Sequence, residues 1–280
     1  MEFLNFNLET ITPVFINGYD QTELRPSSFK GSIRYWFRAA IAEESIQKLH
    51  NKEKNIFGST DKVSTFSIRI KNLNEINNNS KNITRLCPLP HKKEKSNFKL
   101  PAFKKDIAFD VLLTQKDKNL DLLRDIFILS LLLGGIGQRS RRGFGSIQDT
   151  NVTFNNKGDF LKKVSNILKK ISSKECKIKN NELIFATSKK YDYPVIKKVI
   201  IGKSFDREKI LNMIGNATHN HNDRAIGNGV PRMASPVYIT IKKIGQDFYP
   251  IITKLEAVYP KKYKVSKPNE KIKKFINELR

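Results

Sequence analysis

Residues 134–145, which we call the glycine-arginine segment, combine the two residue types that a polyanion-binding loop needs. The segment reads GGIGQRSRRGFG, so glycines alternate with arginines. Glycine lets the backbone adopt a positive φ and approach a ligand closely, and arginine offers a planar fork that matches phosphate oxygens. We therefore predict that the segment clamps the backbone of a nucleic acid. The expected contacts are Gly137, Gln138, Arg139, Ser140, Arg141 and Arg142, with Phe144 as a stacker on a base.

The glycine-arginine segment is not one of the familiar nucleotide-binding loops. It contains no GxxxxGK[ST] pattern, which a Walker A loop requires. Its glycines follow a predicted helix and precede a predicted strand, whereas a dinucleotide fingerprint has the opposite order. The remaining alternative is a helix-to-strand connection with incidental charge, but such connections do not need this density of glycine and arginine.

A second set of cations lies early in the chain. Lys30, Arg34 and Arg38 recur every four residues, so they share one face of a helix predicted from Ser28 to Glu44. That face is either an ordinary solvated surface or a basic ridge that tracks phosphates. The second interpretation requires the helix to lie beside the glycine-arginine segment. Trp36 belongs to the apolar stripe of the same helix, which favours a place in the core over base stacking.

Three further residues complete the predicted RNA-binding set. Arg25 and Ser28 stand at the start of the early helix, where Ser27 or Ser28 would cap free amides. Arg232 lies in a turn-rich segment, residues 227–236, together with Ser235. The sequence leaves open whether this segment is a structural turn or a phosphate contact.

The charge of the chain points to an anionic partner. The 280 residues carry 52 Lys+Arg against 27 Asp+Glu, a formal net charge of +25. A charge of this size says much about partners and little about fold. Nucleic acid is the leading candidate and an anionic membrane surface the second. A skewed, lysine-rich composition would explain many of the lysines, but the arginines cluster where the lysines do not.

Other function classes find little support. The first residues do not resemble a signal peptide, and the longest apolar run, Ile126 to Leu133, is too short to span a bilayer, so we expect a cytoplasmic protein. Cys87 and Cys176 belong to no CxxC pair, which predicts neither zinc nor a disulfide framework. We expect no cofactor. The histidines are His50, His91, His219 and His221. The last two favour a polar surface loop over a metal site, although a histidine is the usual general base in metal-free RNA cleavage.

Hydrophobic periodicity predicts a mixed α+β chain. In the first half we expect strands at residues 3–8, 65–70, 106–114 and 146–154, helices at 28–44, 43–55 and 120–133, and a long polar insertion at 72–98. In the second half we expect helices at 160–171, 207–214 and 267–280 and strands at 195–201, 236–242 and 248–258.

The order of these elements matches the ferredoxin-like plan, also called split βαβ. RNA-recognition modules (RRM) use the same layout. The second half repeats the theme more loosely. We therefore predict an α+β fold of two ferredoxin-like units: residues 1–155, with the insertion near 72–98, and a degenerate unit at residues 156–280.

Three stretches together resemble a known family. They are residues 12–15 with 24–38 (TPVF and LRPSSFKGSIRYWFR), residues 56–59 (IFGS) and residues 137–146 (GQRSRRGFGS). The combination is similar to the RAMP superfamily of CRISPR-associated proteins. The early-helix pattern, together with residues 232–236 (RMASP), resembles subunit one of the type III-B (Cmr) effector complex.

The resemblance implies a non-catalytic role in antiviral defence. Such a subunit sits at one end of a filament of RAMP proteins and helps to hold guide (CRISPR) RNA and target RNA, while other subunits cleave. Its implied partners are both RNAs and the other RAMP subunits, with no membrane. Carried over to this chain, Lys30, Arg34, Arg38 and residues 138–144 form the RNA-facing surface. Two alternatives remain: a RAMP-type metal-independent endoribonuclease that processes CRISPR RNA, and a generic binder of polyanions or membranes.

Overall fold

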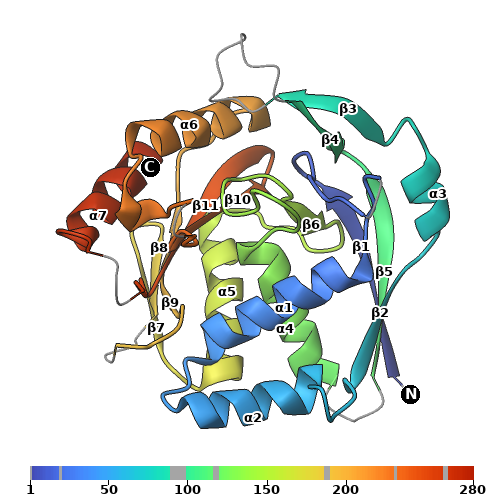
Figure 1. Ribbon diagram of the computed structural model, residues 1–280, viewed down its shortest axis with the longest axis horizontal. Coiled ribbons are helices and arrows are strands. Elements are labelled where there is room, and N and C mark those ends of the chain that lie inside the picture. The colour runs from blue at the N-terminus through green and yellow to red at the C-terminus, as the bar shows by residue number, and fades with distance from the viewer. Residues whose placement is uncertain are drawn as a thin grey trace.

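The computed structural model describes residues 2–18, 21–88, 99–115, 120–185, 190–229, 232–260 and 264–280. It shows a mixed α+β fold with two main antiparallel sheets (Figure 1). The predicted α+β class is therefore confirmed. None of the helices in these ranges is long and apolar enough to cross a membrane.

The first sheet is four-stranded, in the order β2-β5-β1-β6, and all neighbouring strands run antiparallel. Its elements are β1 (Glu2–Thr10), α1 (Pro26–Ile41), α2 (Ile46–Phe57), β2 (Phe66–Ile70), β5 (Ala108–Gln115), α4 (Leu120–Leu133) and β6 (Ile147–Asp149). Alternate side chains of β1, such as Phe6 and Leu8, are buried beneath the helices, as a strand with one covered face requires. α1 and α4 pack against each other over this sheet.

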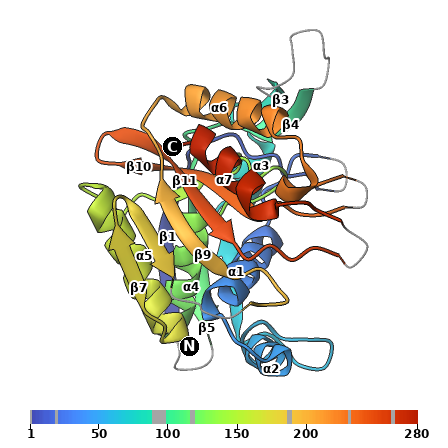
Figure 2. The ribbon, with the colours of Figure 1, turned by 90° about the vertical axis from the view of Figure 1, so that its left-hand side faces the viewer.

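The second sheet is five-stranded, in the order β10-β11-β9-β8-β7, and is also antiparallel. Its elements are α5 (Lys157–Ser172), β7 (Cys176–Lys179), β8 (Glu182–Phe185), β9 (Ile196–Ile201), α6 (Arg207–Asn220), the 3-10 helix η1 (Arg224–Ile226), β10 (Val237–Ile244), β11 (Asp247–Leu255) and α7 (Pro268–Glu278). α6 and α7 pack on one face, and Figure 2 shows α7 crossing in front of β9 and β11. Both faces of β10 are covered, so nearly all its side chains are buried.

α4 lies between the two sheets. It contacts β1 and β6 on one side and β10 and β11 on the other (Figure 1). Its sequence is apolar almost all round, and its residues from Ile126 to Leu133 are all buried. A helix that is hydrophobic on every side is one that must be enclosed. The core of the molecule therefore runs through α4 from one half to the other.

Several predicted elements differ from the structure. The start of α1 was predicted to be capped by Ser27 or Ser28, but Arg25 occupies the N-cap position and no side chain caps the helix. The helix ends at Ile41, where Ala42 turns left-handed (φ 47°). β6 has three residues in place of the predicted strand at 146–154, because residues 150–155 leave the sheet in a turn.

Several short helices and strands lie in polar stretches where no regular structure was predicted. Within the predicted insertion the chain forms α3 (Leu73–Asn78) and β3 (Ile83–Pro88), which pairs with β4 (Lys99–Phe103) in a two-stranded sheet. Residues 89–98 of that insertion lie outside the described residues. The β7–β8 hairpin was missed, and α6 continues beyond its predicted end to Asn220. Both hairpins are short and rich in lysine or polar residues, so the hydrophobic period is too brief to detect.

Candidate nucleic-acid interface

The glycines of the glycine-arginine segment serve close backbone packing. Gly145 has a φ of +65°, and a Cβ there would lie 1.9 Å from the carbonyl oxygen of Ile136. A Cβ on Gly137, which has a φ of +80°, would lie 2.3 Å from the carbonyl oxygen of Phe15. At Gly134 the nearest atom would be the indole nitrogen of Trp36 in α1, at 2.2 Å. The segment therefore folds back on itself and onto α1, as only glycine allows.

Most backbone amides of the segment are used by this fold. Their N–H groups donate to carbonyl oxygens as follows: Gln138 to Phe15 (2.7 Å), Arg142 to Arg139 (2.8 Å), Gly143 to Ile239 (2.9 Å) and Gly145 to Pro13 (2.9 Å). The predicted amide clamp is therefore wrong for these positions. Within the described ranges, the amides of Arg139, Ser140 and Arg141 have no hydrogen-bond partner. These three form the tip of the segment.

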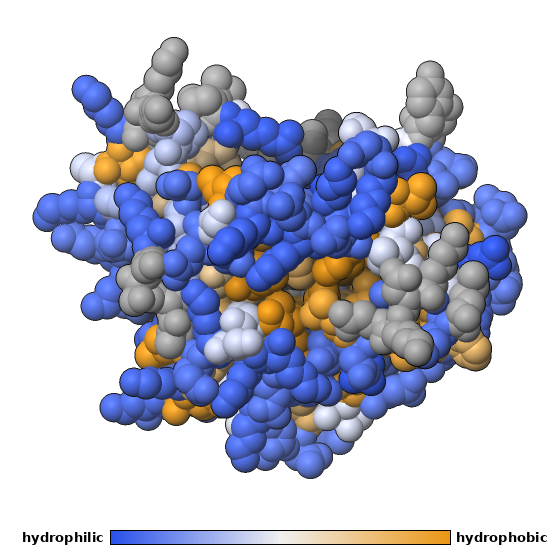
Figure 3. All heavy atoms as spheres, turned by 90° about the horizontal axis from the view of Figure 1, so that it is seen from below, coloured by the Kyte–Doolittle hydropathy of each residue, from blue (hydrophilic) through white to orange (hydrophobic). Residues whose placement is uncertain are grey.

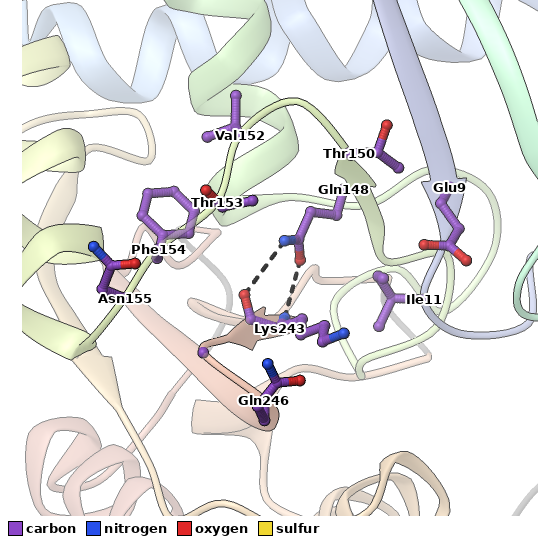
Figure 4. Close-up of a pocket in the computed structure, with 11 residues that line it drawn as sticks. Glu9, Ile11, Gln148, Thr150, Val152, Thr153, Phe154, Asn155, Lys243 and Gln246 are labelled. Atoms are coloured by element: carbon purple, nitrogen blue, oxygen red, sulfur yellow. Dashed lines mark hydrogen bonds between the residues drawn. The ribbon is translucent and has the colours of Figure 1, made fainter.

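Residues 141–148 run along the edge of β10 and join the two sheets. We call this junction the seam (residues 141–148 with β10). Three alternate β10 residues donate their backbone N–H to it: Ile239 to Arg141 O (3.2 Å), Ile241 to Ser146 Oγ (2.9 Å) and Lys243 to Gln148 Oε1 (2.9 Å). Gln148 returns a bond from its Nε2 to Lys243 O (3.3 Å), and Figure 4 shows this pair beside a cleft of about 420 Å³. A side-chain amide thus takes the place of a strand backbone.

Arg141 connects the segment to the early helix. Its guanidinium lies 4.9 Å from the ring centroid of Tyr35 in α1 and 5.1 Å from that of Tyr238 in β10. Its Nη1 donates to Ser235 O at 2.8 Å. Stacking on aromatic faces is a favourable use of arginine. The two cationic elements therefore lie side by side, as a common site requires.

Arg142 is turned inward and holds the molecule together. Its Nη1 donates to the carbonyl oxygens of Arg141 and Val237, and its Nη2 to that of Ile226, all at 3.2 Å. The guanidinium also lies over the ring of Phe275, 5.3 Å from its centroid. Burial, with a smaller contribution from the charge of Arg141, lowers the pKa of Arg142 to about 10, so it is still protonated at neutral pH. A phosphate contact by Arg142 does not fit this position.

Phe144 also points inward. Its ring is 5% exposed and lies 4.9 Å from the ring of Phe15. The prediction that Phe144 stacks on a base is therefore wrong. By contrast, Gly137, Gln138 and Arg139 are exposed, and Arg139 adopts a left-handed φ of 57° that turns the chain at the tip.

The basic face of α1 is present, but two of its arginines share a carboxylate. Nε of Arg34 pairs with Oε1 of Glu53 in α2, and Nε of Arg38 lies 3.6 Å from Oε2. The Glu53 side chain is only 8% exposed, whereas about 44% of each arginine side chain is exposed. The two ion pairs therefore connect α2 to α1, and both guanidinium groups remain partly exposed to solvent.

The other predicted contacts are dispersed around this face. Lys30 lies over the ring of Phe66, 5.4 Å from its centroid, and its pKa is lowered by burial and by the charge of Arg34. Arg25 pairs with Glu23 at 2.8 Å. Ser28 is half-buried and Arg232 is exposed. Trp36 is fully buried, which confirms its place in the core.

Segment 227–236 lies beside the glycine-arginine segment. The carbonyl oxygen of Ser235 accepts the hydrogen bond from Arg141. The Ser235 hydroxyl accepts from Val237 N at 3.1 Å, so its role is structural. Arg232 lies three residues before Ser235 and is exposed, and sequence spacing alone could not show the contact between Ser235 and Arg141.

The described histidines form no catalytic cluster. His221 pairs with Glu278 of α7, Nε2 to Oε2 at 2.7 Å. His219 belongs to the last turn of α6 and His50 to α2, while His91 lies outside the described residues. Within the described ranges, no group of three or more His, Cys, Asp or Glu residues could hold a metal ion.

The outer surface fits the composition. Figure 3 shows hydrophilic side chains over most of the face seen from below, around a smaller hydrophobic area near its centre. The chain as a whole carries a formal net charge of +25, which attracts a polyanion over a long range.

Comparison with known proteins identifies the family. Residues 7–148 match the family model described as the RAMP superfamily. The chain belongs to the RAMP superfamily. This match covers most of the first sheet, α1 and the whole glycine-arginine segment.

Two curated relatives come from Pyrococcus furiosus. The CRISPR system Cmr subunit Cmr1-2 is 41% identical over 69 residues, which is 23% of this chain and 37% of that protein. Cmr subunit Cmr1-1 is 29% identical over 156 residues, 51% of this chain and 46% of that protein. The matched stretches thus span less than half of the length of these relatives.

Solved structures share the fold over nearly the whole chain. The crystal structure of Cmr1 from Pyrococcus furiosus (apo form) matches with a TM-score of 0.63 at 21% identity, covering 99% of this chain and 96% of that one. A chain from the cryo-EM structure of the type III-B Cmr-beta bound to cognate target RNA matches with a TM-score of 0.62 at 14% identity, covering 99% of both chains. At these identities the likeness is one of fold.

Proposed function

We propose that the protein is a non-catalytic RNA-binding subunit of a type III-B CRISPR effector complex. In this role it helps to hold guide RNA and target RNA at one end of a RAMP filament, in contact with other RAMP subunits. The observation that carries the proposal is the position of Arg141. Its guanidinium lies 4.9 Å from the ring centroid of Tyr35 in α1 and 5.1 Å from that of Tyr238 in β10, so the glycine-arginine segment contacts the helix that carries Arg34 and Arg38. Family membership and the Cmr names of the relatives support it.

The proposed mechanism is electrostatic. Arg139 and Arg232 are exposed, and Arg34 and Arg38 present about half of their side chains to solvent. Arginines placed in this way neutralise phosphates, which fixes the register of a strand but carries no sequence information. The unpartnered amides of residues 139–141 would add donors at the tip. Guide-target base pairing would then supply the specificity. Arg142 and Phe144 are left out of this surface because they are turned inward.

We also propose that both halves are ferredoxin-like, with a boundary near residue 155. In the first sheet β5 lies between β1 and β2 and antiparallel to both, which is the split βαβ arrangement. In the second sheet β11 lies in the same way between β9 and β10. There the strand outside β9 is β8, which precedes it in the chain. The second unit therefore departs from the ferredoxin-like connection, because its fourth strand precedes the other three in the chain.

The proposal is tested by removing exposed charge without disturbing the seam. We expect the double variant Arg139→Gln, Arg232→Gln to bind single-stranded RNA about ten-fold more weakly at low salt, for all sequences alike. The slope of log affinity against log salt should fall by about 1.4, because each lost phosphate contact contributes about 0.7. Fluorescence anisotropy with labelled RNA measures both quantities.

A control with the same charge change is available on α5. Lys162→Gln, Lys163→Gln removes two positive charges from a helix on which no RNA contact is proposed. If both double variants lose affinity equally, the surface formed by α1 and the glycine-arginine segment is not the site. The non-catalytic part of the proposal is tested separately, by incubating the protein with repeat RNA in the presence and absence of a chelator. Specific cleavage that is lost on His219→Ala would contradict it.

A further inference from the structure

A lysine-lined cavity lies at one end of the second sheet, and its lining residues have no part in the site described above. Its volume is about 540 Å³, and it is formed by the start of β9, the end of β11 and the first turn of α7. The polar and charged side chains in its lining are Lys190, Lys197, Lys254, Glu256, Tyr259 and Asn269. Three ammonium groups thus face one carboxylate.

The cations of this cavity are only partly compensated. Lys197 pairs with Glu256 at 2.8 Å, and Lys254 has a long contact of 3.4 Å from its Nζ to Asn269 Oδ1. Lys190 makes no ion pair with any residue in the described ranges. The neighbouring Lys198 is paired outside the cavity with Glu182. The lining therefore carries an excess of positive charge that a bound anion would offset.

The lowered pKa of Lys254 indicates that its positive charge is disfavoured in this cavity. Its pKa is lowered, chiefly by burial; the carboxylate of Glu256 opposes the change, and Lys198 and Lys197 add to it. A half-buried ammonium group among other lysines is stabilised when an anion approaches it. Lysine ammonium groups are common phosphate ligands because they act as compact point charges.

The cavity adjoins the proposed RNA surface through two described stretches of chain, residues 224–229 and residues 232–237. On one side, Arg142 donates to Ile226 O and Arg141 donates to Ser235 O. On the other side, Tyr259 approaches Ala225 O at 3.4 Å, and Leu255 N donates to Pro236 O at 2.8 Å. The exposed Arg232 lies within the second stretch. Arg141 thus lies on one side of these stretches, and the lysines of the cavity lie on the other.

We propose that the cavity is a second phosphate-binding subsite for single-stranded RNA. A strand held at Arg139 and Arg141 would pass over Ser235 and Pro236 and place a phosphate against Lys197 and Lys254. This inference rests on the proposed function and extends it, because it assigns part of the RNA path to the second half of the chain. If it is correct, only an RNA long enough to reach both sites should lose affinity when the cavity lysines are replaced.

RNA length separates the two sites experimentally. We would compare anisotropy of labelled oligouridines of about 8 and about 24 nucleotides, using the full chain, the variant Lys197→Gln, Lys254→Gln and the α5 control. We expect the short RNA to bind the variant as it binds the wild type. The long RNA should bind about ten-fold more weakly, with a salt slope reduced by about 1.4. Glu256→Gln, which removes the only carboxylate, should tighten binding of the long RNA two- to three-fold.

Each outcome decides one of the two proposals. If the wild type binds neither RNA, the proposed function fails. If it binds both but the cavity variant and the α5 control behave alike with the long RNA, the subsite is wrong and the proposed function stands. Uridine monophosphate distinguishes a free nucleotide from a strand. If it raises the Tm of the wild type only, and the long RNA is unaffected by the variant, the cavity binds a nucleotide and the subsite for RNA is overturned.

Discussion

The inner and outer sides of the glycine-arginine segment use the same residue type for opposite purposes. On the inner side, Arg142 gives three hydrogen bonds to carbonyl oxygens and packs on Phe275. On the outer side, Arg139 stands exposed in a left-handed turn. Arg141 lies between these two positions in the chain, and its side chain donates to Ser235 O and lies over the ring of Tyr35. The difference teaches that a high density of arginine in a loop can serve the packing of the fold as well as the RNA contact that we propose.

The same contrast holds for the glycines. A loop that binds phosphate leaves its backbone N–H groups free. On the inner side of this segment, backbone N–H groups donate instead to the carbonyl oxygens of Phe15, Ile239 and Pro13. Its glycines are required because backbone lies against backbone. We therefore expect the inner side to determine stability and the outer tip to determine RNA binding, and four comparisons of variants test that division.

The largest effect should come from Gly145→Ala. A Cβ would lie 1.9 Å from Ile136 O at a φ of +65°, so both strain and overlap oppose it. We expect a loss of more than about 3 kcal/mol of unfolding free energy, measured by urea denaturation. Gly31→Ala in α1, where nothing lies within 4 Å of the added carbon, should stabilise by about 0.5–1 kcal/mol. Equal effects at both glycines would contradict the close packing.

Arg142→Met should cost about 3 kcal/mol, because the carbonyl oxygens of Val237 and Ile226 lose the guanidinium donor at the junction with β10. Arg139→Met, three residues earlier, should change stability by less than about 0.5 kcal/mol while weakening RNA binding. Thermal unfolding and anisotropy measured on both variants give the comparison. A stable Arg142→Met protein with weakened RNA binding would reverse the assigned roles.

Lys242 gives the seam a pH dependence. It is fully buried, its Nζ donates to Ile147 O at 2.6 Å, and burial lowers its pKa to about 7. The unfolded lysine has a pKa near 10.4, so between about pH 7 and pH 10 the unfolded chain binds more protons. Stability contributed by this group therefore rises with pH across that window.

The variant Lys242→Met removes the titrating group. We expect the difference in unfolding free energy between wild type and variant to shift by roughly 2 kcal/mol between pH 6.5 and pH 9.5, in favour of the wild type at the higher pH. Urea denaturation of both proteins at the two pH values measures it. A difference that is constant with pH would mean that Lys242 keeps an ordinary pKa in the fold.

The smallest effect concerns the outer side alone. Glu53→Gln releases Arg34 and Arg38 from their shared carboxylate, so RNA affinity should rise two- to three-fold at low salt. Asp121→Asn removes one exposed carboxylate that pairs with Arg124 on α4 and serves as a charge-matched control. If the control gains as much, the increase reflects net charge and not the release of these two arginines.

Sequence reasoning located the elements well where the hydrophobic period was long. The bounds of α4 were predicted correctly, since fourteen residues of nearly continuous apolar character leave little choice. The strands predicted at residues 236–242 and 248–258 correspond to β10 and β11. Short elements such as β7 and β8 were missed because four residues carry too few periods.

The candidate site was predicted as a region but not residue by residue. Spacing placed Arg34 and Arg38 on one face, yet it could not show that Glu53, from a later helix, would lie between them. Nor could it show which of Arg141 and Arg142 faces outward, because a turn of irregular φ has no period. Lys197 and Lys254 were overlooked, since they come from different strands and only the sheet brings them together.

The position of α4 has a consequence for how the protein can be divided. Cutting the chain near residue 155 would strip one flank of α4 of β10 and β11, and expose apolar side chains from Ile126 onward to water. Neither fragment would keep a sealed interior. We therefore expect the two halves to fold and unfold together as one cooperative unit.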